Sequence, residues 1–234
     1  MTALLAAVAV AVGAVVQWAT GFGFSLVCAP FLIAAYKAPT GVQLNLVLSV
    51  VVNLALLTRE HRRIDYRAVG LLLVPAMVAA VPAAYVVRHA RTGPLTVVAG
   101  LICLAGVVAL ARGRELRGLA GRSGTAVVGV VSGGMNAAAG ISGPPVVLYA
   151  VNARWPVDRA RPTLQLFFLG LNVVTLASLG VPDRLPLPIV AGFAAGVLGG
   201  AALAGRLPEA AVRPATLALA GAGSVLAVVR GLTA

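Results

Sequence analysis

The stretch GISGPP, residues 140–145, interrupts one of the most apolar parts of the chain. Two glycines, a serine and two prolines do not favour a continuous helix, yet the flanking segments VVGVVSGGMNAAA and VVLYAV are typical of membrane-embedded helices. A backbone group left unpaired in lipid costs several kcal/mol, so a break persists only where protein or a watery cavity covers it. The stretch therefore predicts a broken helix that lines a polar hollow.

Composition predicts that the rest of the chain is also embedded. Hydrophobic residues make up 60% of the 234 residues and charged residues only 10%, and the mean hydropathy is +1.01. A soluble core of this size could not bury so much apolar surface. Long uncharged runs with short arginine-bearing connections favour helices over strands, because a helix satisfies its backbone groups internally. We therefore expect an all-α polytopic membrane protein in contact with the lipid bilayer.

The charged and sulfur-containing residues exclude several classes of function. The net charge is +12, but the basic residues sit at the ends of apolar runs, where they are expected to anchor the topology against anionic lipid rather than to bind nucleic acid. Cys28 and Cys103 lie within apolar runs, so neither a disulfide nor a metal site is indicated. We expect no cofactor and no metal.

Apolar runs divide the chain into eight segments, two of which are too long for a single span. The first contains about 35 residues, roughly 50 Å as one helix against a hydrocarbon thickness of about 30 Å, and Gly21-Phe22-Gly23 interrupts it. The fifth contains GISGPP. We expect each to be a broken helix or a helical hairpin. The runs are 2–36, 40–57, 68–87, 94–111, 124–151, 163–180, 186–205 and 212–229.

The two interruptions indicate an internal repeat. Gly21 and Gly140 are 119 positions apart, and the same offset pairs Asn53 with Asn172. Asparagine is scarce in this chain, so these matches favour a duplication into halves 1–118 and 119–234 that form one integral membrane domain.

Charge counting bears on whether the halves run parallel or inverted. If each long run crosses the membrane once, the 18 Lys and Arg residues split almost evenly between the two sides. If each long run makes two crossings, five of them (Lys37, Arg88, Arg91, Arg184 and Arg230) lie opposite the other thirteen. The second arrangement obeys the positive-inside rule. It predicts two inverted repeats, each with a break followed by three transmembrane helices, with both termini outside. A parallel 4+4 arrangement is the alternative.

Each break is a candidate anion site, because the helix that restarts presents unbonded N–H groups and the positive end of its dipole. Pro144 and Pro145 are expected in the first turn of the second restart, so the Ser142 hydroxyl and nearby amides would have to donate. Glycines at 21, 23, 140 and 143 would permit positive φ and close approach to a ligand. The candidate substrate-binding residues are Gly21, Phe22, Gly23, Phe24, Ser25, Gln43, Asn136, Gly140, Ser142, Gly143, Pro144 and Gln165.

Two other interpretations of these residues stay open. The glycines could serve close helix packing, as small residues commonly do in membranes. The amides could instead bridge helices, and this applies equally to the other uncharged amides within the runs, Gln17, Asn45, Asn53 and Asn172.

The acidic residues narrow the chemistry further. All six fall in predicted connections, so no carboxylate is expected at depth to hold a cation or relay protons, and an anionic substrate is easier to accommodate. An intramembrane enzyme would need a nucleophile with a base, or a metal cluster, at depth, and the runs contain neither pattern. We therefore expect a protein that is not an enzyme. The acids are Glu60, Asp65, Glu115, Asp158, Asp183 and Glu209.

The motif GFGFSLVCAPFL at 21–32, with its counterpart GISGPPVVLYA at 140–150, resembles the TauE/SafE family of sulfite and organosulfonate exporters, also called TSUP. The resemblance extends over essentially the whole chain. It implies a multi-pass protein of the bacterial cell inner membrane that moves sulfite, sulfonates or related small anions. The first half lacks the Gly-Pro pair of the second. The matching motif positions are Gly21, Gly23, Pro30, Gly140, Gly143, Pro144 and Pro145.

Together these observations favour a secondary transporter of a small sulfur-containing anion, working by alternating access at a site between the two broken helices. Export is the direction that the resemblance implies. The alternatives are an importer, a carrier of another small anion such as a carboxylate, and a non-transport membrane scaffold. A homodimer is left open.

Overall fold

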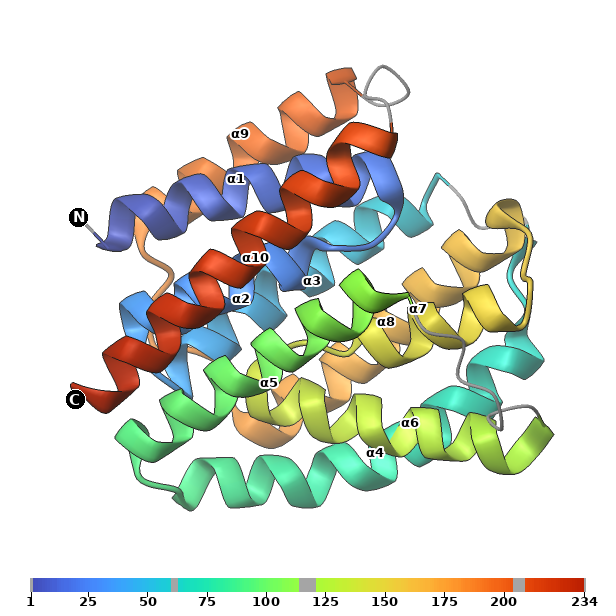
Figure 1. The fold of residues 1–234 in the computed structure, drawn as a ribbon, viewed down its shortest axis with the longest axis horizontal. Helices are drawn as coiled ribbons and strands as arrows, with labels where there is room; N and C mark the ends of the chain where they lie inside the picture. Colours follow the sequence, from blue (N-terminus) through green and yellow to red (C-terminus); the bar gives the residue numbers. More distant parts are fainter. Residues whose placement is uncertain (1, 60–62, 114–120, 204–208, 234) are drawn as a thin grey trace.

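The computed structural model describes residues 2–59, 63–113, 121–203 and 209–233, and within these ranges the chain is all-helical (Figure 1). This confirms the prediction of an all-α protein. The helices are α1 (Thr2–Thr20), α2 (Phe24–Tyr36), α3 (Thr40–Leu57), α4 (Tyr66–His89), α5 (Thr92–Arg112), α6 (Gly121–Ala139), α7 (Gly143–Asn152), α8 (Val157–Leu179), α9 (Leu187–Leu203) and α10 (Glu209–Leu232).

Several of these helices are long and apolar enough to cross a membrane. In the described part of the chain six meet both conditions, namely α1, α3, α4, α5, α8 and the segment Pro214–Leu232 of α10. Helices α2 and α9 are apolar but shorter. The protein is therefore a multi-pass, polytopic membrane protein.

Both overlong runs are broken where the sequence predicts. Helix α1 ends at Thr20 and α2 begins at Phe24, while α6 ends at Ala139 and α7 begins at Gly143. Positive φ angles of 81° at Gly21, 117° at Gly23 and 68° at Gly140 let the backbone turn. With 13 and 10 residues, α2 and α7 are about 20 and 15 Å long, shorter than a hydrocarbon core of about 30 Å.

One glycine behaves differently from the prediction. Gly143 was expected to adopt positive φ, but it is the first residue of α7 and is not among the glycines with positive φ. That expectation is wrong because residues 140–142 complete the turn before Gly143, which is already helical. The prolines lie in the first turn of α7, as expected.

The helix ends fall into two groups. Figure 1 shows both termini at one end of the molecule, together with the α4–α5 and α8–α9 connections, while α6 and α8 begin and α3 and α7 finish at the opposite end. The charge count above divides the basic residues between the same two groups of connections. Of the residues counted above, Glu60, Arg62, Arg114, Glu115, Arg117 and Arg206 lie outside the described residues.

Close helix packing depends on glycines away from the breaks. Gly133 of α6 lies against α4, and a Cβ added there would come within 2.0 Å of the Ala76 carbonyl oxygen. Gly196 of α9 lies against α1 in the same manner, and a Cβ added there would come within 2.4 Å of the Ala11 carbonyl oxygen. Small residues that let backbones touch are a common means of helix association in membranes. Gly133 and Gly196, which are not the glycines of the breaks, therefore allow close helix packing at these two interfaces.

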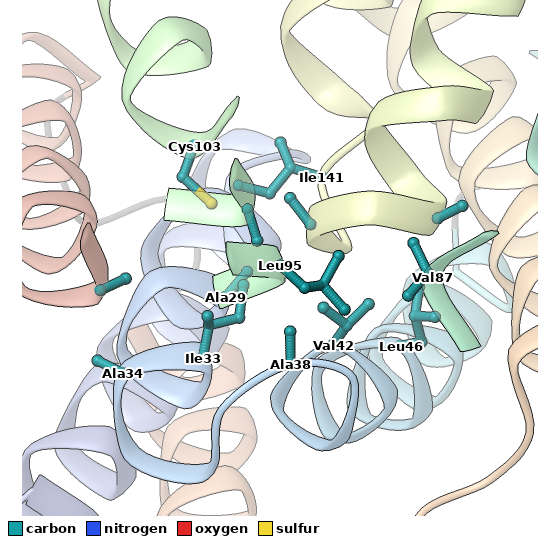
Figure 2. Close-up of a cluster of buried hydrophobic side chains, with 14 of the residues drawn as sticks. Ala29, Ile33, Ala34, Ala38, Val42, Leu46, Val87, Leu95, Cys103 and Ile141 are labelled. Carbon is teal, nitrogen blue, oxygen red and sulfur yellow. The ribbon is translucent and has the colours of Figure 1, made fainter. Parts of the chain in front are cut away.

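A cluster of buried apolar side chains fixes the second break. It contains Ile33 of α2, Val42 of α3 and Leu95 of α5, and Ile141 lies in it, between α6 and α7 (Figure 2). Only 1% of the Ile141 surface is exposed. Because close packing resists displacement of a buried side chain, this contact holds the residue next to Ser142 in one position.

The role of Gly133 in helix packing can be tested by comparing substitutions at Gly133 and at Gly134. Gly133→Val should destabilise the protein by about 1–3 kcal/mol, since the added methyl groups meet the backbone of α4. Gly134→Val is the matched control, because a Cβ at Gly134 meets nothing within 4 Å. Melting of the two purified variants in detergent measures the difference, and equal melting temperatures would contradict this account of the α4–α6 interface.

Candidate functional site

The two breaks share one small cavity. Its volume is about 30 Å³, which is room for a water molecule or a small ion. Phe22, Gly23, Phe24 and Ser25 of the first break and Ser142, Gly143 and Pro144 of the second lie on its wall. None of the described residues that line it is charged. The other residues of the wall are Gln17, Leu26, Ser49, Asn53, Leu110, Ile141, Phe168 and Asn172.

Seven of the twelve predicted site residues therefore line the cavity, and five do not. Gly21, Gln43, Asn136, Gly140 and Gln165 lie outside its wall. Four of these five take part in hydrogen bonds that hold the breaks in place. Gln43 instead donates to the Leu179 carbonyl at 3.2 Å, near the end of α8.

Each break has a backbone carbonyl that an amide from the other half satisfies. Gln165 of α8 donates through its Nε2 to the Gly21 carbonyl. Asn45 of α3 donates through its Nδ2 to the Gly140 carbonyl at 2.8 Å. Both amide residues are fully buried. These two bonds supply hydrogen-bond donors that lipid lacks, and they explain how the helices can be interrupted inside the protein.

A second pair of bonds lies beside the cavity. Gln17 donates through its Nε2 to the Asn53 Oδ1 at 3.1 Å, and Asn136 donates through its Nδ2 to the Asn172 Oδ1 at the same distance. Each residue of the first bond is 119 positions before its counterpart in the second. The sequence left open whether these amides bridge helices, and the two bonds show that they do, joining α1 to α3 and α6 to α8. Which amide bonds to which is decided only when each half is folded.

The two half-sites differ in what they can donate. The Phe24 amide donates to the Gln17 Oε1 at 2.9 Å, so it is already used, contrary to the expectation that it would be open to a ligand. The Ser25 and Leu26 amides, in the first turn of α2, have no acceptor among the described residues. The prolines in the first turn of α7 leave that helix fewer donors.

Hydroxyl groups supply the remaining polar surface. Ser25 and Ser49 lie 3.0 Å apart, Oγ to Oγ, and both line the cavity. Ser142 is the N-cap residue of α7, but its side chain makes no capping hydrogen bond. Ser49 was not predicted. It lies one helical turn before Asn53, so the face of α3 that carries Asn53 was the signal for it.

A larger cavity, which we call the vestibule, adjoins the small one. Its volume is about 840 Å³, and it shares Phe22, Leu26 and Leu110 with the small cavity. Its other walls come from α1, α7, α8 and α10 and are mostly apolar. These three residues therefore border both the small cavity and the vestibule.

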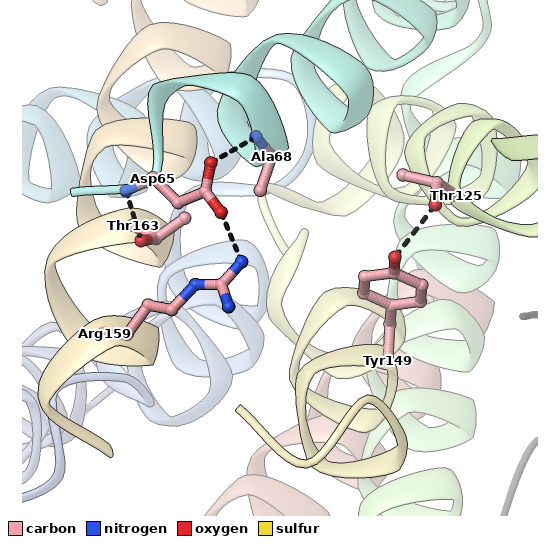
Figure 3. Close-up of polar contacts among 6 residues, drawn as sticks. All are labelled: Asp65, Ala68, Thr125, Tyr149, Arg159 and Thr163. Atoms are coloured by element: carbon pink, nitrogen blue, oxygen red, sulfur yellow. Dashed lines mark hydrogen bonds and ion pairs between the residues drawn. The ribbon is translucent and has the colours of Figure 1, made fainter. Parts of the chain in front are cut away.

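Beside the vestibule, an ion pair joins α4 to α8. Asp65 accepts from the Ala68 amide at 2.9 Å and from Arg159, and its own amide donates to the Thr163 hydroxyl at 3.1 Å (Figure 3). The Ala68 amide, together with Arg159, lowers the pKa of the Asp65 carboxyl below its usual value. Figure 3 also shows the Thr125 and Tyr149 hydroxyls, 2.9 Å apart, which link α6 to α7.

The family model for Sulfite exporter TauE/SafE matches residues 5–227. The chain belongs to this family. The match confirms the resemblance noted from the glycine motifs and spans both breaks. Membership implies a membrane transporter of sulfite or a related sulfur anion, in keeping with a multi-pass protein of the cell inner membrane. No curated protein and no solved structure matched the chain.

Two glycines of the second break can be compared by substitution. Gly140 forms the turn, whereas Gly143 lines the cavity. Gly140→Ala should lower stability by about 1–2 kcal/mol, because φ is 68° and the new methyl would lie 2.7 Å from the Asn45 Nδ2. Gly143→Ala should leave the melting temperature unchanged, since its nearest neighbour, the Phe168 Cζ, is 4.0 Å away. Melting curves in detergent test both. Equal losses would mean that the turn does not depend on Gly140.

Proposed function

We propose that the small cavity between the breaks is the substrate site, and that the protein exports sulfite or a similarly small sulfur anion by alternating access. The observation that carries this proposal is the convergence of two helix N-termini and three serine hydroxyls on one cavity. Helix N-termini and hydroxyl groups favour an anion, through the dipole and through direct hydrogen bonds.

The composition of the wall supports an anion over a cation. Ser25, Ser49 and Ser142 can each donate a hydrogen bond, and none of the described wall residues is a carboxylate that would attract a cation. The aromatic residues Phe22 and Phe168 cover the remaining surface. An anion held by neutral donors leaves more easily than one held by fixed positive charge, which suits a transporter that must release what it binds.

The cavity volume of about 30 Å³ bears on the substrate. In this conformation it suits an anion of a few atoms, such as sulfite, better than an organosulfonate with a long tail. We propose sulfite as the first substrate to test and short sulfonates as the second.

We propose that the halves 1–118 and 119–234 are inverted repeats that move against each other. The helix bounds support this, because α1 (Thr2–Thr20) shifted by 119 positions gives the bounds of α6 (Gly121–Ala139). The packing supports it as well. Helix α1 packs on α9 and α6 packs on α4, so exchanging the halves exchanges these contacts, and α5 packs on its counterpart α10. Such symmetry is common in secondary transporters.

In this proposal, the distribution of basic residues indicates to which side of the membrane the vestibule opens. The end of the molecule with most of the basic residues faces the cytoplasm by the positive-inside rule, with both termini outside. The vestibule is lined by the first turn of α8 and the last turn of α7, which lie at that end. The conformation is therefore open toward the cytoplasm, from which an exporter takes its substrate.

Transport of radiolabelled sulfite in proteoliposomes tests the proposal. The wild-type protein should show saturable flux, and Ser142→Ala should raise the KM about tenfold, as expected for loss of one hydrogen bond to a charged ligand. Ser123→Ala is the control, because Ser123 is exposed near the start of α6. Absence of saturable flux of sulfite or short sulfonates would contradict the proposed function. An unchanged KM in Ser142→Ala would remove this hydroxyl from the site.

A further inference from the structure

Arg161 is the charged residue among the described residues that line the vestibule. It lies in the second turn of α8, and its side chain is half-buried. Val157, Ala160 and Leu164 of the same helix line the vestibule as well, so this face of the α8 N-terminus borders the cavity. The remaining walls are mostly apolar, which strengthens the field of a charge placed there.

The protein holds the Arg161 side chain in place but leaves much of its guanidinium unused. One Nη2 hydrogen is donated to the Ala19 carbonyl at 2.8 Å, at the end of α1. The aliphatic part of the side chain packs on Gly21, where an added Cβ would lie 2.8 Å from the Arg161 Cγ. The Nε is buried and has no hydrogen-bond partner among the described residues. Arginine carries five donors, so several remain for a ligand.

Neighbouring arginines differ from Arg161 in having acidic partners. Arg159 pairs with Asp65, and Arg63 pairs with Asp158. Those two carboxylates are therefore engaged by other arginines, and in the described part of the chain no ion pair includes Arg161. A half-buried charge without a counter-ion is costly, because nothing offsets its lost hydration. An arriving anion would offset it.

We propose that Arg161 forms a second anion site, in the vestibule, that takes up a small sulfur oxyanion before it passes Phe22, Leu26 and Leu110 into the small cavity. This inference rests on the proposed function. The planar guanidinium fits two oxygens of a sulfite or sulfonate group, and the N-terminal end of α8 adds to the positive potential. The site raises the local concentration of anion at the mouth of the central cavity.

The test compares three variants in proteoliposomes of known orientation, with sulfite supplied on the vestibule side. Arg161→Gln should raise the KM about tenfold, leave the maximal rate near that of the wild type, and weaken the dependence of KM on NaCl concentration. Arg161→Lys keeps the charge and should keep the KM within about threefold of the wild type. Arg67→Gln, an exposed arginine at the start of α4, removes the same charge and should change neither constant.

The outcomes separate this inference from the proposed function. Saturable wild-type flux with an unchanged KM and salt dependence in Arg161→Gln would overturn the vestibule site and leave the central site standing. Wild-type protein without flux would end both. If Arg161→Gln does not fold, Arg161→Lys decides. A wild-type KM in that variant supports capture by charge, and a KM raised about tenfold or more in a protein that melts normally overturns it.

Discussion

The structure depends on one constraint, which is that lipid cannot satisfy a broken backbone. Two glycine carbonyls are exposed by the turns at Gly21 and Gly140, and each is satisfied by a buried amide, Gln165 for the first and Asn45 for the second. Without these bonds each turn would leave a carbonyl unpaired inside the membrane. The small cavity between the breaks exists because the protein supplies these partners.

These bonds run between the halves of the chain. Gln165 belongs to the second half and supports the first break, while Asn45 belongs to the first half and supports the second. Neither break is therefore complete within its own half. In our proposal the halves move against each other during transport, so the two bonds are the contacts that such motion must preserve or exchange, and they couple the central site to the relative position of the halves.

Much of the fold follows from local signals in the sequence. The apolar runs predicted the helices, and glycines in overlong runs predicted both breaks, because a span of about 20 residues is fixed by membrane thickness. The prolines at 144 and 145 marked the start of α7 correctly, because a missing N–H is harmless in the first turn. These features depend on neighbours in the chain and need no knowledge of the rest of the fold.

The site was less predictable, because it is assembled from residues far apart in the chain. Asn136 lies four residues before Gly140 in the chain, yet its side chain bonds to Asn172 and Thr175 and does not line the cavity. Ser49 and Phe168 line the cavity as well. Ser49 shares a helix face with Asn53, but no pattern in the sequence indicated Phe168. Which face of α3 or α8 meets the breaks is decided by the packing of the two halves, and one sequence does not reveal that packing.

The most direct measurement is the position of a bound sulfite analogue that can be located by its scattering. Selenite is, like sulfite, a small pyramidal oxyanion, and its selenium gives an anomalous signal in a crystal of the protein. The account predicts a selenium peak between the breaks, within hydrogen-bond reach of the Ser25 and Ser142 hydroxyls. Selenite bound only at positions remote from both breaks, under conditions in which it inhibits sulfite flux, would contradict it.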